Sequence, residues 1–229
     1  MRALSYLPNL LTLGNLAAGS WAIALSYEGD WTGFALALGI AMGCDWLDGG
    51  LARLLHAESS MGKELDALAD LVSFGLAPAF GLYNYLRPEL PLLPYSREAK
   101  TWMIMAPFIL PFLAAWRLAR FNASPPSDLR FFAGLPTPAH GAFWSLWLIS
   151  EPYGYWLHPI AWMGLILLVG VLMVSKFPFF SLKSRQNILW AAFTIFSVGL
   201  GWMFLSGSVW VVFALLMYAG VSYVAARFL

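Results

Sequence analysis

Long hydrophobic runs separated by short polar connections dominate the sequence from end to end. A membrane-spanning helix needs about 20 mainly apolar residues. The windows that reach or approach this length are 8–27, 31–55, 63–86, 100–122, 136–150, 158–175, 187–205 and 208–228. The fifth window is short, and the Ser206-Gly207-Ser208 turn joins the last two as an antiparallel hairpin. The pattern therefore predicts an all-α fold, a polytopic integral membrane helix bundle of about eight transmembrane helices.

The chain is expected to form one membrane-embedded domain over residues 1–229, because no polar linker is long enough to divide it. The first window follows Arg2, as the apolar part of a secretory signal would. It also carries polar residues such as Asn9 and Asn15, so we expect a helix that is retained rather than cleaved.

Composition supports the membrane assignment. Hydrophobic residues make up 60% of the chain and charged residues 11%, against about 25% charged in an ordinary soluble domain. The 12 tryptophans suit anchoring at membrane interfaces. A net charge of +1 gives no field that would favour nucleic acid, and the single cysteine, Cys44, excludes an internal disulfide.

The distribution of Lys and Arg predicts the orientation. With a cytoplasmic N-terminus, only Arg87, Arg97 and Lys100 of the 13 basic residues fall on the outer side. Basic residues concentrate in cytoplasmic loops. Both termini are therefore expected in the cytoplasm, together with the turn between the second and third windows.

Four aspartates stand around that turn, inside otherwise apolar segments, at the spacing D-x2-D-G-x2-A-R-x8-G-x3-D-x3-D. The residues that fill this pattern are Asp45, Asp48, Gly49, Ala52, Arg53, Gly62, Asp66 and Asp70. A carboxylate at membrane depth is costly unless a partner compensates it. Divalent cations such as Mg²⁺, Mn²⁺ or Ca²⁺ prefer oxygen ligands, so the pattern predicts an intramembrane metal site.

The spacing places the aspartates in two pairs. Asp45 and Asp48 share one face near the end of a helix, and Asp66 and Asp70 share one face near the start of the next. A hairpin of these helices brings the pairs together around one metal ion or two. Ion pairing with nearby arginines and lysines would explain one isolated aspartate, but four at this spacing favour the metal site.

The pattern resembles the signature of the CDP-alcohol phosphatidyltransferase family, with every position filled. Within that family the chain is most similar to the CDP-diacylglycerol–serine O-phosphatidyltransferases, the phosphatidylserine synthases of bacteria and archaea. The similarity covers a catalytic core of about residues 8–185 and leaves 187–228 as an additional hairpin. The blocks that carry it are PNLLTLGN at 8–15, DLVSFGLAP at 70–78, RLARFN at 117–122, GLPTPA at 134–139 and MVSK at 173–176. His140 and Gly141 depart from the small residues expected there.

The resemblance implies the roles of the aspartates. Asp45, Asp48 and Asp66 would be metal ligands, and Asp70 would lie near a second metal as general base. The resemblance implies two ions, Mg²⁺ or Mn²⁺, with Ca²⁺ able to occupy the site. The CDP-lipid would be recognised by Gly49, Ala52, Arg53 and Gly62. The reaction would be direct displacement of CMP at the inner, cytoplasmic leaflet of a prokaryotic cytoplasmic membrane.

Other polar residues extend the predicted site. Thr12 and Asn15 share a helix face at the same depth and either reach the CDP-lipid or bond a neighbouring helix. Serine carries a carboxylate that needs a cation. Arg117 and Arg120 are the leading candidates, with Asn122 beside them and Lys183 next, unless these residues contact lipid headgroups.

Three alternatives stay open. The acceptor could be glycerol 3-phosphate or inositol phosphate, because the same basic residues would bind a phosphate. The donor could be an archaeal ether lipid. A divalent-cation transporter would also place acids in the membrane, although it would need them at several depths.

Family members are often homodimers, so a homodimer is expected without an interface visible in the sequence.

Overall fold

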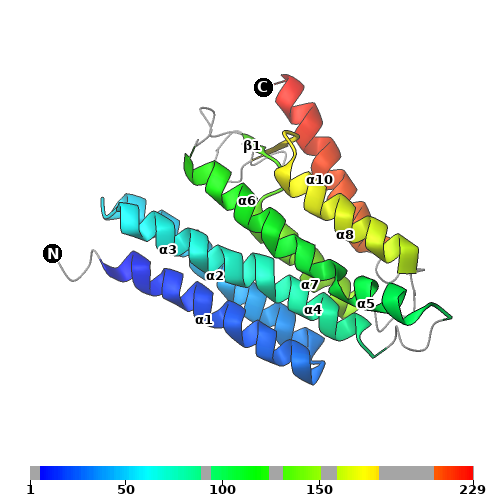
Figure 1. Cartoon of the computed structure of the whole chain (residues 1–229). Coiled ribbons are helices and arrows are strands. Elements are labelled where there is room, and N and C mark those ends of the chain that lie inside the picture. Colours follow the sequence, from blue (N-terminus) through cyan, green and yellow to red (C-terminus); the bar gives the residue numbers. More distant parts are fainter. Residues whose placement is uncertain (1–5, 89–93, 124–130, 151–158, 181–208, 229) are drawn as a thin grey trace.

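The computed structural model describes residues 6–88, 94–123, 131–150, 159–180 and 209–228, and its helices pack side by side into a bundle (Figure 1). The first half comprises α1 (Leu7–Glu28), α2 (Trp31–Leu54), α3 (Ser60–Asp70), the π-helix η2 (Leu71–Leu76) and α4 (Ala77–Leu86). The second half comprises α5 (Arg97–Met105), the short 3-10 turn η4 (Ala106–Phe108), α6 (Ile109–Ala123), α7 (Thr137–Ser150), α8 (Pro159–Val174) and α10 (Val209–Phe228). Two short strands, β1 (Phe131–Ala133) and β2 (Pro178–Phe180), complete the described elements.

Four segments among these residues are long and apolar enough to cross a membrane, namely Leu7–Glu28, Trp31–Leu54, Ser60–Leu86 and Arg97–Ala123. They coincide with the first four predicted windows. The fifth and sixth windows correspond to α7, of 14 residues, and α8, of 16 residues. The eighth corresponds to α10, and the seventh lies outside the described residues. The chain is thus a helical membrane protein, while a total of eight spans stays a prediction.

Local sequence explains where the first helices end. Gly29 takes the left-handed conformation with φ 72°, which ends α1, and Asp30 then caps α2 by accepting a hydrogen bond from the Gly33 N–H at 2.8 Å. Ser59 caps α3 in the same way, accepting from the Gly62 N–H at 3.0 Å. These two tight turns fold α1, α2 and α3 into consecutive antiparallel helices.

A proline accounts for the π-helix η2. In an α-helix the carbonyl of Phe74 would pair with the N–H of residue 78, but residue 78 is proline, which has no N–H. The proline ring would also collide with that carbonyl. The chain passes Pro78 through a wider turn instead, in which the Ala77 N–H reaches the Val72 carbonyl five residues back.

A small antiparallel sheet at the end of α8 is a feature that the hydrophobic pattern did not predict. Phe131 pairs with Phe180 and Ala133 with Pro178. Next to it, Gly134 has φ 84°, and its N–H donates to the Phe177 carbonyl at 2.9 Å. A side chain at Gly134 would collide with the Met173 carbonyl, so the two sequence blocks near 134 and 173 touch directly.

The two ends of the bundle differ in polarity. Figure 1 places the start of α1, the α2–α3 turn and the end of α6 toward the same end. Away from that end, the buried core is aromatic: Trp162 lies 6.2 Å from Trp144 and 5.3 Å from Trp147, ring centroid to centroid, and all three are buried. Large apolar side chains such as Phe112 and Trp116 face outward, as expected of a surface in contact with lipid.

Candidate active site

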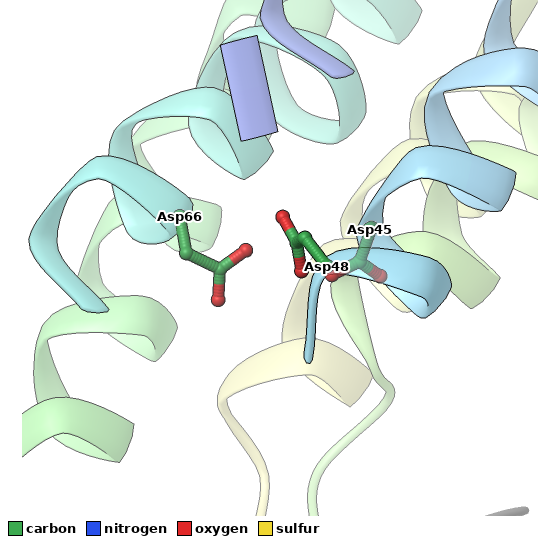
Figure 2. A group of neighbouring side chains, drawn as sticks. All are labelled: Asp45, Asp48 and Asp66. Atoms are coloured by element: carbon green, nitrogen blue, oxygen red, sulfur yellow. The ribbon is translucent and has the colours of Figure 1, made fainter. Parts of the chain in front are cut away.

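Three aspartates converge between α2 and α3. Asp45 and Asp48 extend from α2 toward Asp66 on α3 (Figure 2). Each offers one carboxylate oxygen, and these three oxygens all lie within 4.8 Å of one another. Two oxygens bound to one ion are at most about 4 Å apart for Mg²⁺ and at most about 5 Å apart for Ca²⁺. The three carboxylates therefore fit a divalent cation as they stand.

Asp70 lies one turn beyond Asp66, where α3 passes into η2. It is buried, and its Oδ1 accepts a hydrogen bond from Asn15 Nδ2 at 3.1 Å. Its Oδ2 accepts a longer one, 3.4 Å, from the hydroxyl of Thr137 on α7. Donors from α1 and α7 thus hold both oxygens of a carboxylate that adjoins the cluster of three.

The two polar residues of α1 bond directly to the aspartates. The Thr12 hydroxyl lies 2.6 Å from Asp48 Oδ2 and 3.1 Å from the Pro8 carbonyl. With one proton to give, it donates to the shorter and charged partner. Asn15 bonds Asp70 as described above. Of the two roles left open by the sequence, bonding to a neighbouring helix is therefore observed, while contact with a CDP-lipid stays a prediction.

The remaining motif residues border the carboxylates on the α2 and α3 side. Arg53 is exposed in the last turn of α2, and its Nη1 would lie 3.6 Å from a Cβ placed on Gly49. Ala52 is half-buried on the same helix. A Cβ on Gly62 would lie 3.1 Å from Ser59 Oγ, closer than ordinary contact, so glycine there keeps the helix cap tight. Binding of a nucleotide by these residues stays a prediction.

The two arginines of α6 have different surroundings. Arg117 is buried, donates from Nη1 to the Thr137 hydroxyl at 3.3 Å and so reaches Asp70 through one residue. Its Nε is buried and has no hydrogen-bond partner among the described residues. Arg120 instead donates to three backbone carbonyls, at 2.7 Å to Val174, 3.3 Å to Ala133 and 3.4 Å to Ser175. Arg120 thereby ties α6 to the ends of β1 and α8.

The last predicted acceptor residues lie at the periphery. Asn122 is exposed near the end of α6. Lys183 lies outside the described residues. A serine-binding role for either one stays a prediction.

Two site residues carried no assigned role in the sequence. Thr137 is part of the block at 134–139. A single threonine after Gly134-Leu135-Pro136 gives no sign in the sequence that it contacts an aspartate. His140 stood out only as a departure from the expected small residue, and the structure buries it completely, with its Nδ1 against the Phe74 carbonyl of η2. Only the fold, which brings α7 against α3 and η2, shows that these residues belong to the site.

The arrangement combines three kinds of group at one end of the bundle: a carboxylate cluster fit for a cation, a buried carboxylate oriented by two donors, and a buried guanidinium. Such a set suits displacement at a phosphate, in which negative charge must be compensated and a hydroxyl must lose its proton. The site lies among helices long enough to span a membrane.

Comparison with known proteins agrees with this chemistry. A family model described as CDP-alcohol phosphatidyltransferase matches residues 5–193. The chain is 33% identical over 187 residues to a CDP-diacylglycerol–serine O-phosphatidyltransferase of Bacillus subtilis, covering 81% of this chain and 97% of that protein. It is 34% identical to the protein of the same name from Mycobacterium leprae, covering 76% of this chain but 58% of that protein. An archaeal relative of that name, from Methanocaldococcus jannaschii, is 32% identical over 180 residues.

Proposed function

Because this chain belongs to the CDP-alcohol phosphatidyltransferase family, we propose that it transfers a phosphatidyl group from CDP-diacylglycerol to the hydroxyl of L-serine. The products are phosphatidylserine and CMP. The observation that carries the proposal is the convergence of Asp45, Asp48 and Asp66, with their oxygens within 4.8 Å, at the positions that the family motif occupies. The names of the bacterial and archaeal relatives support serine as the acceptor.

Asp45, Asp48 and Asp66 would hold the divalent metal, Mg²⁺ or Mn²⁺, and a second ion would lie beside Asp70. The bound metal supplies positive charge against the diphosphate of the donor and against the departing CMP. Arg53, exposed at the end of α2, adds a planar guanidinium for phosphate oxygens. Gly49 leaves space beside it, since a Cβ there would meet only the Arg53 side chain.

Asp70 is the general base. Its two oxygens are oriented by Asn15 and Thr137, which leaves the remaining lone pairs available to accept the serine hydroxyl proton. The serine oxygen then forms a bond to the phosphorus that bears the lipid, and the bond from this phosphorus to the CMP oxygen breaks. The proton rests on Asp70 and the electron pair leaves with CMP. No covalent enzyme intermediate is needed.

The acceptor pocket lies on the α6 and α7 side of Asp70. Arg117 is better placed than Arg120 to bind the serine carboxylate, because its Nη1 already bonds the threonine that touches Asp70. Its buried Nε has no hydrogen-bond partner within the described segments of the chain. Arg120 donates to three backbone carbonyls, so we assign it chiefly a structural role, holding the wall of the pocket in place.

The site faces the cytoplasm in this proposal, with both termini on that side, and the protein acts as a homodimer in the cytoplasmic membrane. The positive-inside distribution of basic residues supports the orientation. Activity then draws the lipid donor from the inner leaflet and serine from the cytoplasm.

The test is CMP release by the purified full-length protein in detergent micelles with CDP-diacylglycerol and Mn²⁺ or Mg²⁺. Parallel reactions contain L-serine, glycerol 3-phosphate, inositol phosphate or no acceptor, and Asp45→Asn serves as the inactive control. We expect labelled serine to appear in lipid in step with CMP. Release of CMP with another acceptor and none with serine would replace serine in the proposal, and no release with any acceptor would overturn it.

A further inference from the structure

The buried carbonyl of Phe74 is the starting point. It belongs to η2, the π-helix that begins directly after Asp70, and the proline at position 78 deprives it of its α-helical donor. Phe74 is fully buried. Because this carbonyl is buried away from water and has lost its α-helical donor, a side-chain donor to it is favourable.

His140 on α7 supplies that donor. Its Nδ1 lies 2.8 Å from the Phe74 carbonyl oxygen, and its Nε2 lies 3.0 Å from Trp144 Nε1. An indole N–H only donates, so Nε2 must be the acceptor in that pair. The proton of the neutral ring is therefore on Nδ1, where it donates to Phe74.

The same turn of α7 reaches Asp70. Thr137, three residues before His140, donates to Asp70 Oδ2. Gly141, the next residue, packs so closely that a Cβ there would lie 2.8 Å from Phe74 Cδ1. The first turn of α7 thus contacts the carboxylate at the start of η2 and the carbonyl inside it, and the His140 bond sets how closely the two helices approach.

We propose that His140 is a positioning residue for phosphatidyl transfer: by holding η2 at the Phe74 carbonyl, it keeps Asp70 within reach of Thr137 and of the acceptor hydroxyl. The inference rests on the proposed role of Asp70 as general base. It is particular to this chain, because His140 stands where the family resemblance leads us to expect a small residue.

The test compares three full-length variants. His140→Leu keeps apolar volume but removes the donor, His140→Asn places an amide N–H near the position of Nδ1, and Trp144→Phe removes the indole N–H while leaving the histidine donor. The readouts are kcat and KM from CMP release, per molecule that binds CDP-diacylglycerol, and amide hydrogen exchange of the peptide that covers residues 71–78. Expressing kcat per molecule that binds CDP-diacylglycerol distinguishes a positioning effect from a smaller amount of folded enzyme.

We expect His140→Leu to lower kcat on the order of 10- to 100-fold, the effect of a displacement of about 1 Å, with the KM for CDP-diacylglycerol changed less than about threefold. Exchange in 71–78 should speed up in the same variant. His140→Asn should restore most of the rate, and Trp144→Phe should keep it.

A normal kcat in His140→Leu would overturn the proposal, as would an equal loss in His140→Asn and His140→Leu. Unchanged exchange in 71–78 overturns it independently of any turnover. If His140→Leu does not fold, the test rests on His140→Asn, which retains a donor. A kcat close to that of the wild type supports the proposal, and a large loss overturns it. If the wild-type protein uses another acceptor, only the proposed serine specificity is refuted. The role of His140 is then tested by the same comparison of variants with that acceptor.

Discussion

Replacing Thr12 with valine distinguishes its two predicted roles, a hydrogen bond to the neighbouring helix and contact with the CDP-lipid. Valine keeps the shape of threonine but removes the hydroxyl that donates to Asp48 Oδ2 at 2.6 Å. A hydrogen bond to a charged group contributes about 1.5–3 kcal/mol. At 1.4 kcal/mol per tenfold, the whole bond corresponds to roughly 10- to 100-fold, which is the upper limit of the loss in metal affinity because the bond also forms without metal. Groups that orient metal ligands typically contribute about 10- to 100-fold to metal affinity.

The assay is the Mn²⁺ concentration that gives half-maximal CMP release, together with titration calorimetry of Mn²⁺ binding. Ser20→Ala is the matched control. Ser20 lies on the same helix but is exposed, and its hydroxyl donates to the Leu16 carbonyl one turn earlier at 2.8 Å. We expect weaker metal binding in Thr12→Val and none of this effect in the control. An unchanged metal affinity with a raised KM for CDP-diacylglycerol would refute the reasoning and place Thr12 on the lipid donor.

Further predictions concern the carboxylates and the arginines. Asp70→Asn should bind CDP-diacylglycerol normally in an equilibrium assay yet lose about 10²–10⁴-fold in kcat, and near-normal turnover would remove its role as base. Asp45→Ala should weaken Mn²⁺ and CDP-diacylglycerol binding together; retention of both would contradict the metal site. Arg117→Ala should raise the KM for serine much more than that for the lipid, whereas equal effects count against a carboxylate contact. Arg120→Ala should mainly lower the unfolding temperature in detergent, because it loses bonds to three carbonyls worth about 1 kcal/mol or more each, and a selective rise in the serine KM would instead return Arg120 to the acceptor pocket.

The sequence predicts best those features that depend on local pattern. The first four spans follow from hydrophobic length, and the hairpin of α2 and α3 follows from the short turn between them. Because the aspartates stand at helical spacing on both sides of this turn, their convergence could be anticipated. Three of the four, Asp45, Asp48 and Asp66, do lie together.

Features that depend on contacts between distant segments could not be read from the chain. The pairing of β1 with β2 joins residues almost 50 positions apart, and three-residue strands carry too little alternation to be recognised. The bonds of Arg120 to Ala133 at the end of β1 and to Val174 and Ser175 at the end of α8 also join segments that are distant in the sequence. The link from Arg117 through Thr137 to Asp70 joins α6, α7 and α3, so it appears only once the bundle is assembled.

The aromatic core away from the carboxylates has a consequence for the two sides of the bilayer. Trp144, Trp147 and Trp162 are buried against one another, with Phe143 at 4.9 Å from Trp144, and they fill the bundle interior beyond His140. Within the part of the chain that the structure describes, a hydrated ion or a zwitterionic headgroup among the aspartates therefore faces packed apolar rings on the side toward α8. If the site faces the cytoplasm as proposed, we expect the new lipid to be released into the same leaflet that supplied its precursor.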